Sequence, residues 1–255
     1  MKDVILKKLN DIETSNNIKI LHAVESGSRA WGFASKDSDY DVRFIYVRHT
    51  EYYLALEKQD DVLNCELNET FDINGWDIQK VLKLAYKSNP TIFEWSLSPI
   101  VYKTSPIFSS IKDTIFEYFS SKSGLYHYIS TAKSNYKEYL KGDQVRLKKY
   151  FYVIRPILAC RWILDNKSPV PMLFSDLVSA ELPEYMKPYI DYLLDLKMNS
   201  SEKEYGDKIP QVNEFIENEF IAINDEISKL SEGKNSQWQP LDKLFLEVLK
   251  ENFVS

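Results

Sequence analysis

The chain has 255 residues, of which 44% are hydrophobic and 14% are aromatic. This length and apolar content suit one large or two modest globular domains that can bury a substantial core. The formal net charge of −6 excludes binding of polyanions through overall charge, although a local basic patch is compatible with it.

Targeting and membrane signals are not found in the sequence. The first residues, MKDVILKKLNDIETS, include acidic side chains and lack the apolar core of a signal peptide. No apolar run approaches the roughly 20 residues needed to cross a bilayer. Cys65 and Cys160 are far apart and form no CxxC pattern, which suits a reducing compartment. We therefore expect a cytoplasmic protein with no membrane partner.

A helix, a strand and a tight turn open the chain. Apolar residues recur at helical spacing over residues 2–13, and the β-branched run Ile18–Val24 predicts a buried strand. The strand leads into Ser26-Gly27-Ser28, where Gly27 permits a backbone conformation that a side chain would obstruct. Ser28 can cap a short helix, and its hydroxyl beside exposed backbone N–H groups makes the turn a candidate phosphate site.

Two carboxylates stand at the head of a second apolar run. Turn-forming residues at 35–38 precede the predicted strand Asp39–Val47. Because strand side chains alternate, Asp39, Asp41 and Arg43 share one face of it. Paired carboxylates repel each other, whereas Mg²⁺ binds carboxylates together with substrate phosphates. The alternative is a strand start with acidic turn residues, which the Gly-Ser turn upstream disfavours.

The spacing of these residues resembles a known signature. Gly27-Ser28, a gap of ten residues and then Asp39-x-Asp41 is similar to the motif of the DNA polymerase beta nucleotidyltransferase superfamily. The string GSRAWGFASKDSDYDVRFIYV resembles the RlaP-type branch, which is associated with RNA repair. The blocks Gly75–Lys80, Lys87–Trp95 and Lys149–Pro156 carry the same resemblance. It implies an α+β fold with a polymerase-beta-like domain built on a small mixed sheet.

The resemblance also implies a third carboxylate on a neighbouring strand. We prefer Asp72, because its apolar neighbours on both sides are those of a residue presented from a sheet. Asp77 is the alternative, although it precedes a run with helical periodicity and fits a helix N-cap. Glu66 and Glu69 are weaker candidates.

The second half of the chain is predicted to be helical. A short helix over Thr91–Leu97 and a return strand near Ser98–Tyr102 complete a nucleotidyltransferase domain over residues 1–108. An α-helical domain over residues 109–255 follows. Its predicted helices cover residues 111–119, 125–140, 145–164, 184–198, 212–230 and 241–251. Pro156 is expected to kink or split the third of these.

One segment of this half is basic and aromatic. Between Lys133 and Arg155, seven lysines and arginines stand against two acidic residues, with five tyrosines and phenylalanines interleaved. Such a mixture can neutralise phosphates and stack bases. We select Lys149, Tyr150 and Arg155 as candidate contacts to the NTP or the acceptor from across a cleft. The alternative is a solvated basic helix face whose aromatic side chains turn to the core.

A metal-dependent transferase site follows from these assignments. Two Mg²⁺ ions, with Mn²⁺ as a substitute, are expected on Asp39, Asp41 and Asp72, where they would align an NTP for in-line displacement of pyrophosphate. Gly27 and Ser28 would hold phosphates.

The roles of two arginines and the acceptor stay open. Arg29 and Arg43 either offset phosphate charge or brace the carboxylates. The RlaP resemblance implies an RNA 3′ end as acceptor, whereas the acidic net charge favours a small-molecule or protein hydroxyl. A catalytically degenerate, antitoxin-like binding module is a further alternative, against which the intact carboxylates count.

Overall fold

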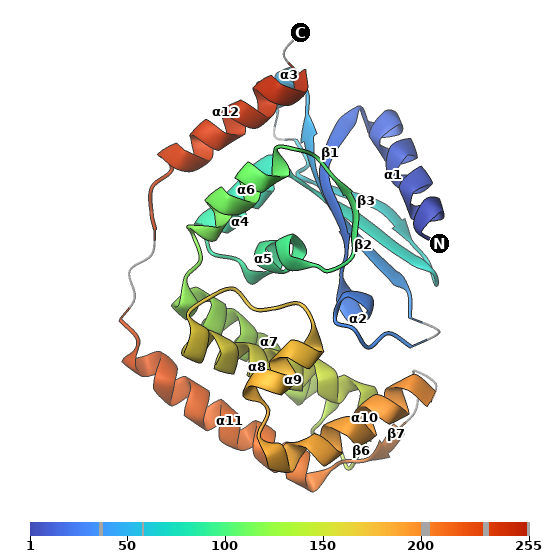
Figure 1. Cartoon of the computed structure of the whole chain (residues 1–255), viewed down its shortest axis with the longest axis vertical. Coiled ribbons are helices and arrows are strands. Elements are labelled where there is room, and N and C mark those ends of the chain that lie inside the picture. Colours follow the sequence, from blue (N-terminus) through green and yellow to red (C-terminus); the bar gives the residue numbers. More distant parts are fainter. Residues whose placement is uncertain (36–37, 58, 200–204, 232–234, 254–255) are drawn as a thin grey trace. The chain divides into compact units, whose positions relative to one another are not determined.

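A computed structural model of the chain describes residues 1–35, 38–57, 59–199, 205–231 and 235–253. These residues form two compact units (Figure 1). The first comprises residues 1–30, 38–119 and the described part of 234–255. The second comprises the described parts of 31–37 and 120–233. A sheet combined with helices confirms the predicted α+β class.

Within its described residues, the first unit contains a five-stranded mixed sheet with helices on both faces. Its elements are α1 (Lys2–Asn16), β1 (Ile18–Glu25), α2 (Gly27–Ala30), β2 (Tyr40–Arg48), α3 (Thr50–Tyr53), β3 (Val62–Leu67), β4 (Phe71–Asp77), α4 (Ile78–Tyr86), α5 (Pro90–Leu97), β5 (Val101–Thr104), α6 (Phe108–Phe116) and α12 (Gln239–Phe253). The strand order is β3-β4-β2-β1-β5. Strands β2 and β4 are parallel, and the other neighbours are antiparallel.

Strand β2 lies between two apolar cores. Its residues Val42, Phe44 and Tyr46 pack in the core beneath α1, whereas Ile45 and Val47 pack in the core covered by α4, α5, α6 and α12 (Figure 1). This is the alternation that the sequence predicts for a strand buried on both faces. Odd-numbered residues at the start of β2 therefore lie on the face opposite α1.

The second unit is mainly helical. Its elements are α7 (Ser121–Tyr139), β6 (Gln144–Arg146), the 3₁₀ helix η1 (Leu147–Tyr150), α8 (Phe151–Asn166), α9 (Phe174–Glu181), the 3₁₀ helix η2 (Glu184–Met186), α10 (Lys187–Asn199), β7 (Tyr205–Asp207) and α11 (Pro210–Lys229). Strands β6 and β7 form an antiparallel ribbon that the sequence did not predict, because three residues are too few to show a period of two. No helix among the described residues is long and apolar enough to cross a membrane.

Helix α8 continues through Pro156 from Phe151 to Asn166, so the predicted split does not occur. Proline has no N–H group and removes the helical hydrogen bond to the Tyr152 carbonyl. The side-chain amide of Asn135 on α7 donates to that carbonyl at 3.3 Å. The freed acceptor is thereby satisfied without breaking the helix.

The boundary between the units differs from the predicted one after residue 108. Helix α6 belongs to the first unit, because Ile111 and Ile115 are buried in the core that it shares with α4. Helix α12 returns to the same core, where Val248 is fully buried. Apart from the short segment that begins at residue 31, the chain enters the second unit after residue 119 instead. Helical periodicity shows that a helix has a buried face, but not which core buries it.

Candidate active site

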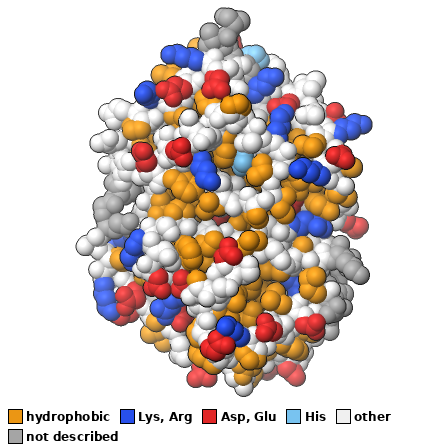
Figure 2. All heavy atoms as spheres, in the orientation of Figure 1, with side chains coloured by type: hydrophobic (Ala, Val, Ile, Leu, Met, Phe, Trp, Pro, Cys, Tyr) orange, Lys and Arg blue, Asp and Glu red, His pale blue; other side chains and the backbone are white. Residues whose placement is uncertain are grey.

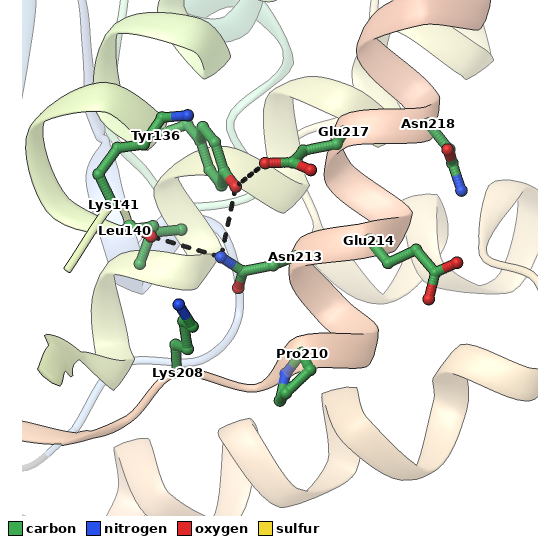
Figure 3. Close-up of a pocket in the computed structure, with 9 residues that line it drawn as sticks. All are labelled: Tyr136, Leu140, Lys141, Lys208, Pro210, Asn213, Glu214, Glu217 and Asn218. Atoms are coloured by element: carbon green, nitrogen blue, oxygen red, sulfur yellow. Dashed lines mark hydrogen bonds between the residues drawn. The ribbon is translucent and has the colours of Figure 1, made fainter. Parts of the chain in front are cut away.

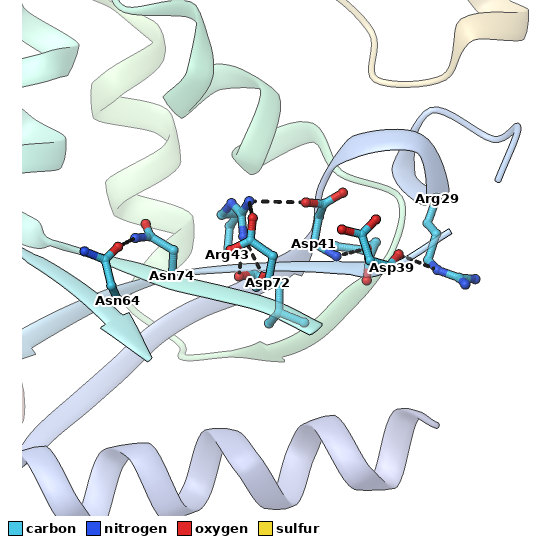
Figure 4. Close-up of polar contacts among 9 residues, drawn as sticks. Arg29, Asp39, Asp41, Arg43, Asn64, Asp72 and Asn74 are labelled. Carbon is cyan, nitrogen blue, oxygen red and sulfur yellow. Dashed lines mark hydrogen bonds and ion pairs between the residues drawn. The ribbon is translucent and has the colours of Figure 1, made fainter. Parts of the chain in front are cut away.

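Parallel pairing of β2 and β4 brings two of the predicted carboxylates together. Asp41 is paired in register with Asp72. Arg43 lies between them (Figure 4), with its Nη2 at 3.2 Å from Asp41 Oδ1 and 2.6 Å from Asp72 Oδ2. Its Nη1 also donates to the backbone carbonyl of Asp72 at 2.6 Å. Arg43 therefore braces the carboxylates, which is one of the two roles that the sequence left open.

Asp39 lies just before β2, with its carboxylate beside that of Asp41 (Figure 4). The loop that carries it is held by Arg29, whose Nε donates to the Asp39 carbonyl at 2.9 Å and whose Nη2 donates to the Ser38 carbonyl at 2.5 Å. The Arg29 guanidinium also lies 3.8 Å from the centre of the Tyr40 ring. Arg29 thus fixes the backbone on which Asp39 is presented.

Gly27 lies directly against the Asp41 carboxylate. Its φ of +58° is in the left-handed region, and a Cβ built there would lie 2.0 Å from Asp41 Oδ2. Any other residue would meet both backbone strain and a collision. The preceding Ser26 N–H donates to the Asp41 carbonyl at 2.8 Å. Ser28, the second residue of α2, follows at once, so the Gly-Ser turn and the carboxylate form one local structure.

A carboxylate that the sequence did not single out supports this structure. Glu25 is fully buried, and its Oε1 accepts the backbone N–H of Asp41 at 2.7 Å. Its Oε2 accepts from the Tyr102 hydroxyl. Burial raises the pKa of Glu25 to about 7. In the sequence, the feature that could have pointed to Glu25 is an acidic residue at the end of an apolar strand, immediately before the Gly-Ser turn.

The electrostatics of the carboxylates suit an added cation. Burial, and then the negative charge of Asp39, raise the pKa of Asp41 to about 6, while Arg43 partly offsets the increase. Two carboxylates held close together without full compensation form the hard oxygen donor set that Mg²⁺ prefers. No group of three potential metal ligands is preformed among the described residues, and Asp72 is bound by Arg43 instead. Asp39 and Asp41 therefore fit the ion, with Arg43 at 3.2 Å from one oxygen of Asp41, whereas Asp72 is bound more closely, at 2.6 Å, and would first have to leave Arg43.

The alternative third carboxylates lie elsewhere. Asp77 caps α4, because its Oδ1 accepts the Gln79 N–H at 2.8 Å and its Oδ2 accepts from the Tyr53 hydroxyl at 2.9 Å. Glu66 forms an ion pair of 2.7 Å with Lys8 of α1. Of the carboxylates that the sequence proposed from this part of the chain, Asp72 is the one paired with Asp41.

Two of the three residues predicted from the helical unit are buried inside that unit. Tyr150 is fully buried and its hydroxyl donates to Asn213 Oδ1 at 2.5 Å. Arg155 is 3% exposed, with its guanidinium 4.7 Å from the centre of the Trp31 ring. This burial favours the alternative in which these side chains turn to the core. Sequence cannot assign the direction, because it depends on which helices pack around α8.

Lys149 is the more accessible member of that group. Its ammonium lies 4.7 Å from the ring centre of Tyr139 and 4.6 Å from that of Tyr152. The contact is a cation–π arrangement at the surface of the helical unit.

The fold and site are those expected of a nucleotidyltransferase, with a mixed sheet that presents carboxylates beside a Gly-Ser turn. The chain belongs to the RlaP family, described as the RNA repair pathway DNA polymerase beta family, whose sequence profile matches residues 1–247. This match confirms the resemblance to the RlaP-type branch and indicates nucleotidyltransferase activity.

One protein is similar to this chain in sequence, and one solved structure has been matched to its fold. The Bacillus subtilis (strain 168) protein described as uncharacterized protein YcgL is 41% identical over 253 residues, which cover 98% of this chain and 97% of that protein. The crystal structure of a nucleotidyltransferase-like protein from Exiguobacterium sibiricum 255-15 is 12% identical and covers 98% of this chain and 81% of its own, with a TM-score of 0.29. A score this low carries no argument, so the assignment depends on the family match.

Proposed function

We propose that this protein transfers a nucleoside monophosphate from an NTP to a hydroxyl acceptor and releases pyrophosphate, with Mg²⁺ as cofactor. The observation that carries the proposal is the register of β2 and β4, which sets Asp41 beside Asp72, with Gly27 against the Asp41 carboxylate. The family match supports the class of reaction.

Asp39 and Asp41 would hold the metal ions. When bound, Mg²⁺ supplies positive charge that aligns the triphosphate and stabilises the attacking and leaving oxygens. Gly27 brings backbone close to the carboxylates, and with Ser28 it would hold the phosphates that are not transferred. Arg29 keeps Asp39 in place by binding the backbone beside it.

Asp72 is proposed to act at the acceptor. The acceptor oxygen forms a bond to the α-phosphorus, the bond from that phosphorus to the bridging oxygen breaks, and the acceptor proton passes to Asp72. Arg43 holds Asp72 and Asp41 together before substrate arrives, since its Nη2 contacts both carboxylates. The guanidinium limits the repulsion between these two carboxylates.

The test is transfer by the purified protein with each labelled NTP, Mg²⁺ and a panel of RNA, protein and small hydroxyl acceptors. Replacing both Asp39 and Asp41 by Asn should lower the rate of pyrophosphate release by several orders of magnitude, because both proposed metal ligands lose their charge. Asp11→Asn on the exposed side of α1 is the matched control and should leave the rate unchanged. A double variant with the wild-type rate would refute the mechanism.

The acceptor proposed first is an RNA 3′ end, which rests on the family description. A small-molecule or protein hydroxyl is the second candidate. Two observations favour it: Lys148 and Arg155 of the basic segment are buried, and basic and acidic side chains are interspersed on the face drawn in Figure 2. Affinity that falls steeply as salt rises would support RNA, whereas salt-insensitive turnover would support the second candidate.

A non-catalytic module is the remaining alternative. An antitoxin-like role would be supported if calorimetry showed that this protein binds no NTP in the presence of Mg²⁺.

A further inference from the structure

A polar pocket lies within the helical unit, between the C-terminal end of α7 and the first turns of α11 (Figure 3). Its volume is about 390 Å³. Sites for small ligands commonly span about 300–1,000 Å³, so the pocket is large enough for one sugar phosphate or nucleotide. None of its lining residues belongs to the candidate active site.

The floor of the pocket is fixed by a chain of hydrogen bonds (Figure 3). The Tyr136 hydroxyl, on a residue only 5% exposed, donates to Glu217 Oε1 at 2.6 Å. Asn213 Nδ2 donates to that hydroxyl and to the Leu140 carbonyl, each at 3.3 Å. The buried Tyr150 hydroxyl donates a hydrogen bond to the Oδ1 atom of the same Asn213 side chain. The Tyr136 bond uses one oxygen of the Glu217 carboxylate, which leaves the second as an acceptor for a ligand.

Charged side chains stand on both sides of Asn213. Lys208, just before α11, lies on one side of it in Figure 3, and Glu217 lies on the other. Lys141, just after α7, extends along Tyr136, with its ammonium 5.0 Å from the centre of that ring. Lys208 is engaged by Asp143 at 3.0 Å, and this exposed ion pair costs little to exchange for a ligand. Helix α11 begins at the pocket without a side-chain cap, so its N-terminus adds partial positive charge.

These charges select a particular ligand chemistry. The lining contains two lysines and two glutamates, so a simple anion gains little net attraction. A ligand that carries an anion at one end and hydroxyl donors at the other satisfies both sides. A carboxylate that accepts from ribose hydroxyls is the same device that dinucleotide-binding folds use.

We propose that this pocket binds a ribose phosphate, with the sugar hydroxyls donating to Glu217 and the phosphate held by Lys208 and by Lys141, whose flexible side chain would turn from the Tyr136 ring. A free mononucleotide and the terminal nucleotide of an RNA both present this group. The inference does not depend on the proposed transfer reaction, because it concerns binding in the helical unit alone.

The test is binding of three probes to the full-length protein without divalent metal, measured by saturation-transfer NMR. The probes are AMP, 2′-deoxy-AMP, which lacks one hydroxyl, and adenosine, which lacks the phosphate. AMP should bind most tightly. Glu217→Gln should weaken AMP by about tenfold and abolish its advantage over 2′-deoxy-AMP, because a charged acceptor is lost. The double variant Lys141→Ala, Lys208→Ala should instead abolish the advantage of AMP over adenosine.

Matched controls are Glu226→Gln on α11 and Lys137→Ala on α7, neither of which lines the pocket. Both should bind AMP as the wild type does. Failure of AMP to bind at millimolar concentration would overturn the proposal. Equal AMP affinity in the wild type and the lysine double variant would also overturn it, because these exposed substitutions leave the hydrogen bonds of the pocket floor intact. A short RNA that displaces AMP would identify an RNA terminus as the source of the ligand, and one that does not would identify a free nucleotide.

Discussion

At the residue scale, the position of the Asp41 carboxylate is set by three neighbours. Gly27 leaves the space that one carboxylate oxygen occupies, and Arg43 binds the other oxygen. Glu25 accepts a hydrogen bond from the backbone N–H of Asp41. A buried acidic residue such as Glu25 is costly unless its oxygens are satisfied, and here both are. We infer that Glu25 is a positioning residue for Asp41.

Replacement of Glu25 tests this role. Glu25→Ala should lower the free energy of unfolding by about 1–3 kcal/mol, because the Asp41 N–H and the Tyr102 hydroxyl lose a buried partner. In the transfer assay it should also raise the Mg²⁺ concentration for half-maximal rate. Glu25→Gln keeps an acceptor for the Asp41 N–H and should restore most of the wild-type Mg²⁺ response. If all three proteins share one Mg²⁺ dependence, Glu25 has only a structural role.

Part of this site was predictable from the sequence and part was not. The motif around Asp39 and Asp41 indicated the carboxylates directly, and the apolar neighbours of Asp72 placed it correctly on the adjacent strand. The Glu25 contact could not be found in this way, because it depends on the pairing of β1 and β2 around a turn. The burial of Tyr150 depends likewise on helix packing.

At the element scale, β1 and α6 are joined by an unusual contact. His22 of β1 is 5% exposed and stacks on Phe108 of α6, with ring centres 3.6 Å apart and planes inclined by 6°. Its Nδ1 lies 3.2 Å from the Thr104 hydroxyl oxygen of β5. Burial lowers the pKa of His22 to about 4. The packing of α6 on the sheet therefore involves a neutral histidine.

The lowered pKa of His22 predicts that its contribution to the stability of the folded protein falls as the pH is lowered. Between the unfolded pKa of about 6.5 and the folded value, the unfolded chain takes up a proton that the native chain excludes. The contribution of His22 should be complete above pH 6.5 and fall as the pH is lowered, by about 3 kcal/mol at most. Glu25, Asp41 and Asp77 have raised pKa values and act in the opposite direction.

Urea unfolding at pH 7.5 and pH 4.5 should therefore be compared between the wild type and His22→Gln. The difference between the two proteins cancels the contribution of the carboxylates. We expect the wild type to lose more stability than the variant on acidification. An identical loss in both proteins would mean that His22 does not resist protonation.

At the scale of the whole molecule, the chain contributes a short segment from residue 31 to the second unit, leaves the first unit again after residue 119 and returns to it with α12. The N-terminal strands and helices could be predicted in order because their periodicities are local. The return of α12 could not, because its apolar face would suit any helical core. The structure identifies the unit that it completes, because α12 packs against β2, α4 and α6, and its Leu244 and Val248 are buried in the core that these elements share.

Truncation of one α12 side chain should reveal this arrangement. Val248→Ala removes two methyl groups from a fully buried position, which should cost about 1–3 kcal/mol in the first unit. Hydrogen exchange should show faster opening of β1 and β2, while α7 and α8 keep their wild-type protection, because local stability follows the core to which an element belongs. Glu247→Ala, at an exposed neighbouring position on the same helix, should change neither region. Loss of protection confined to α7 and α8 would instead assign α12 to the helical unit.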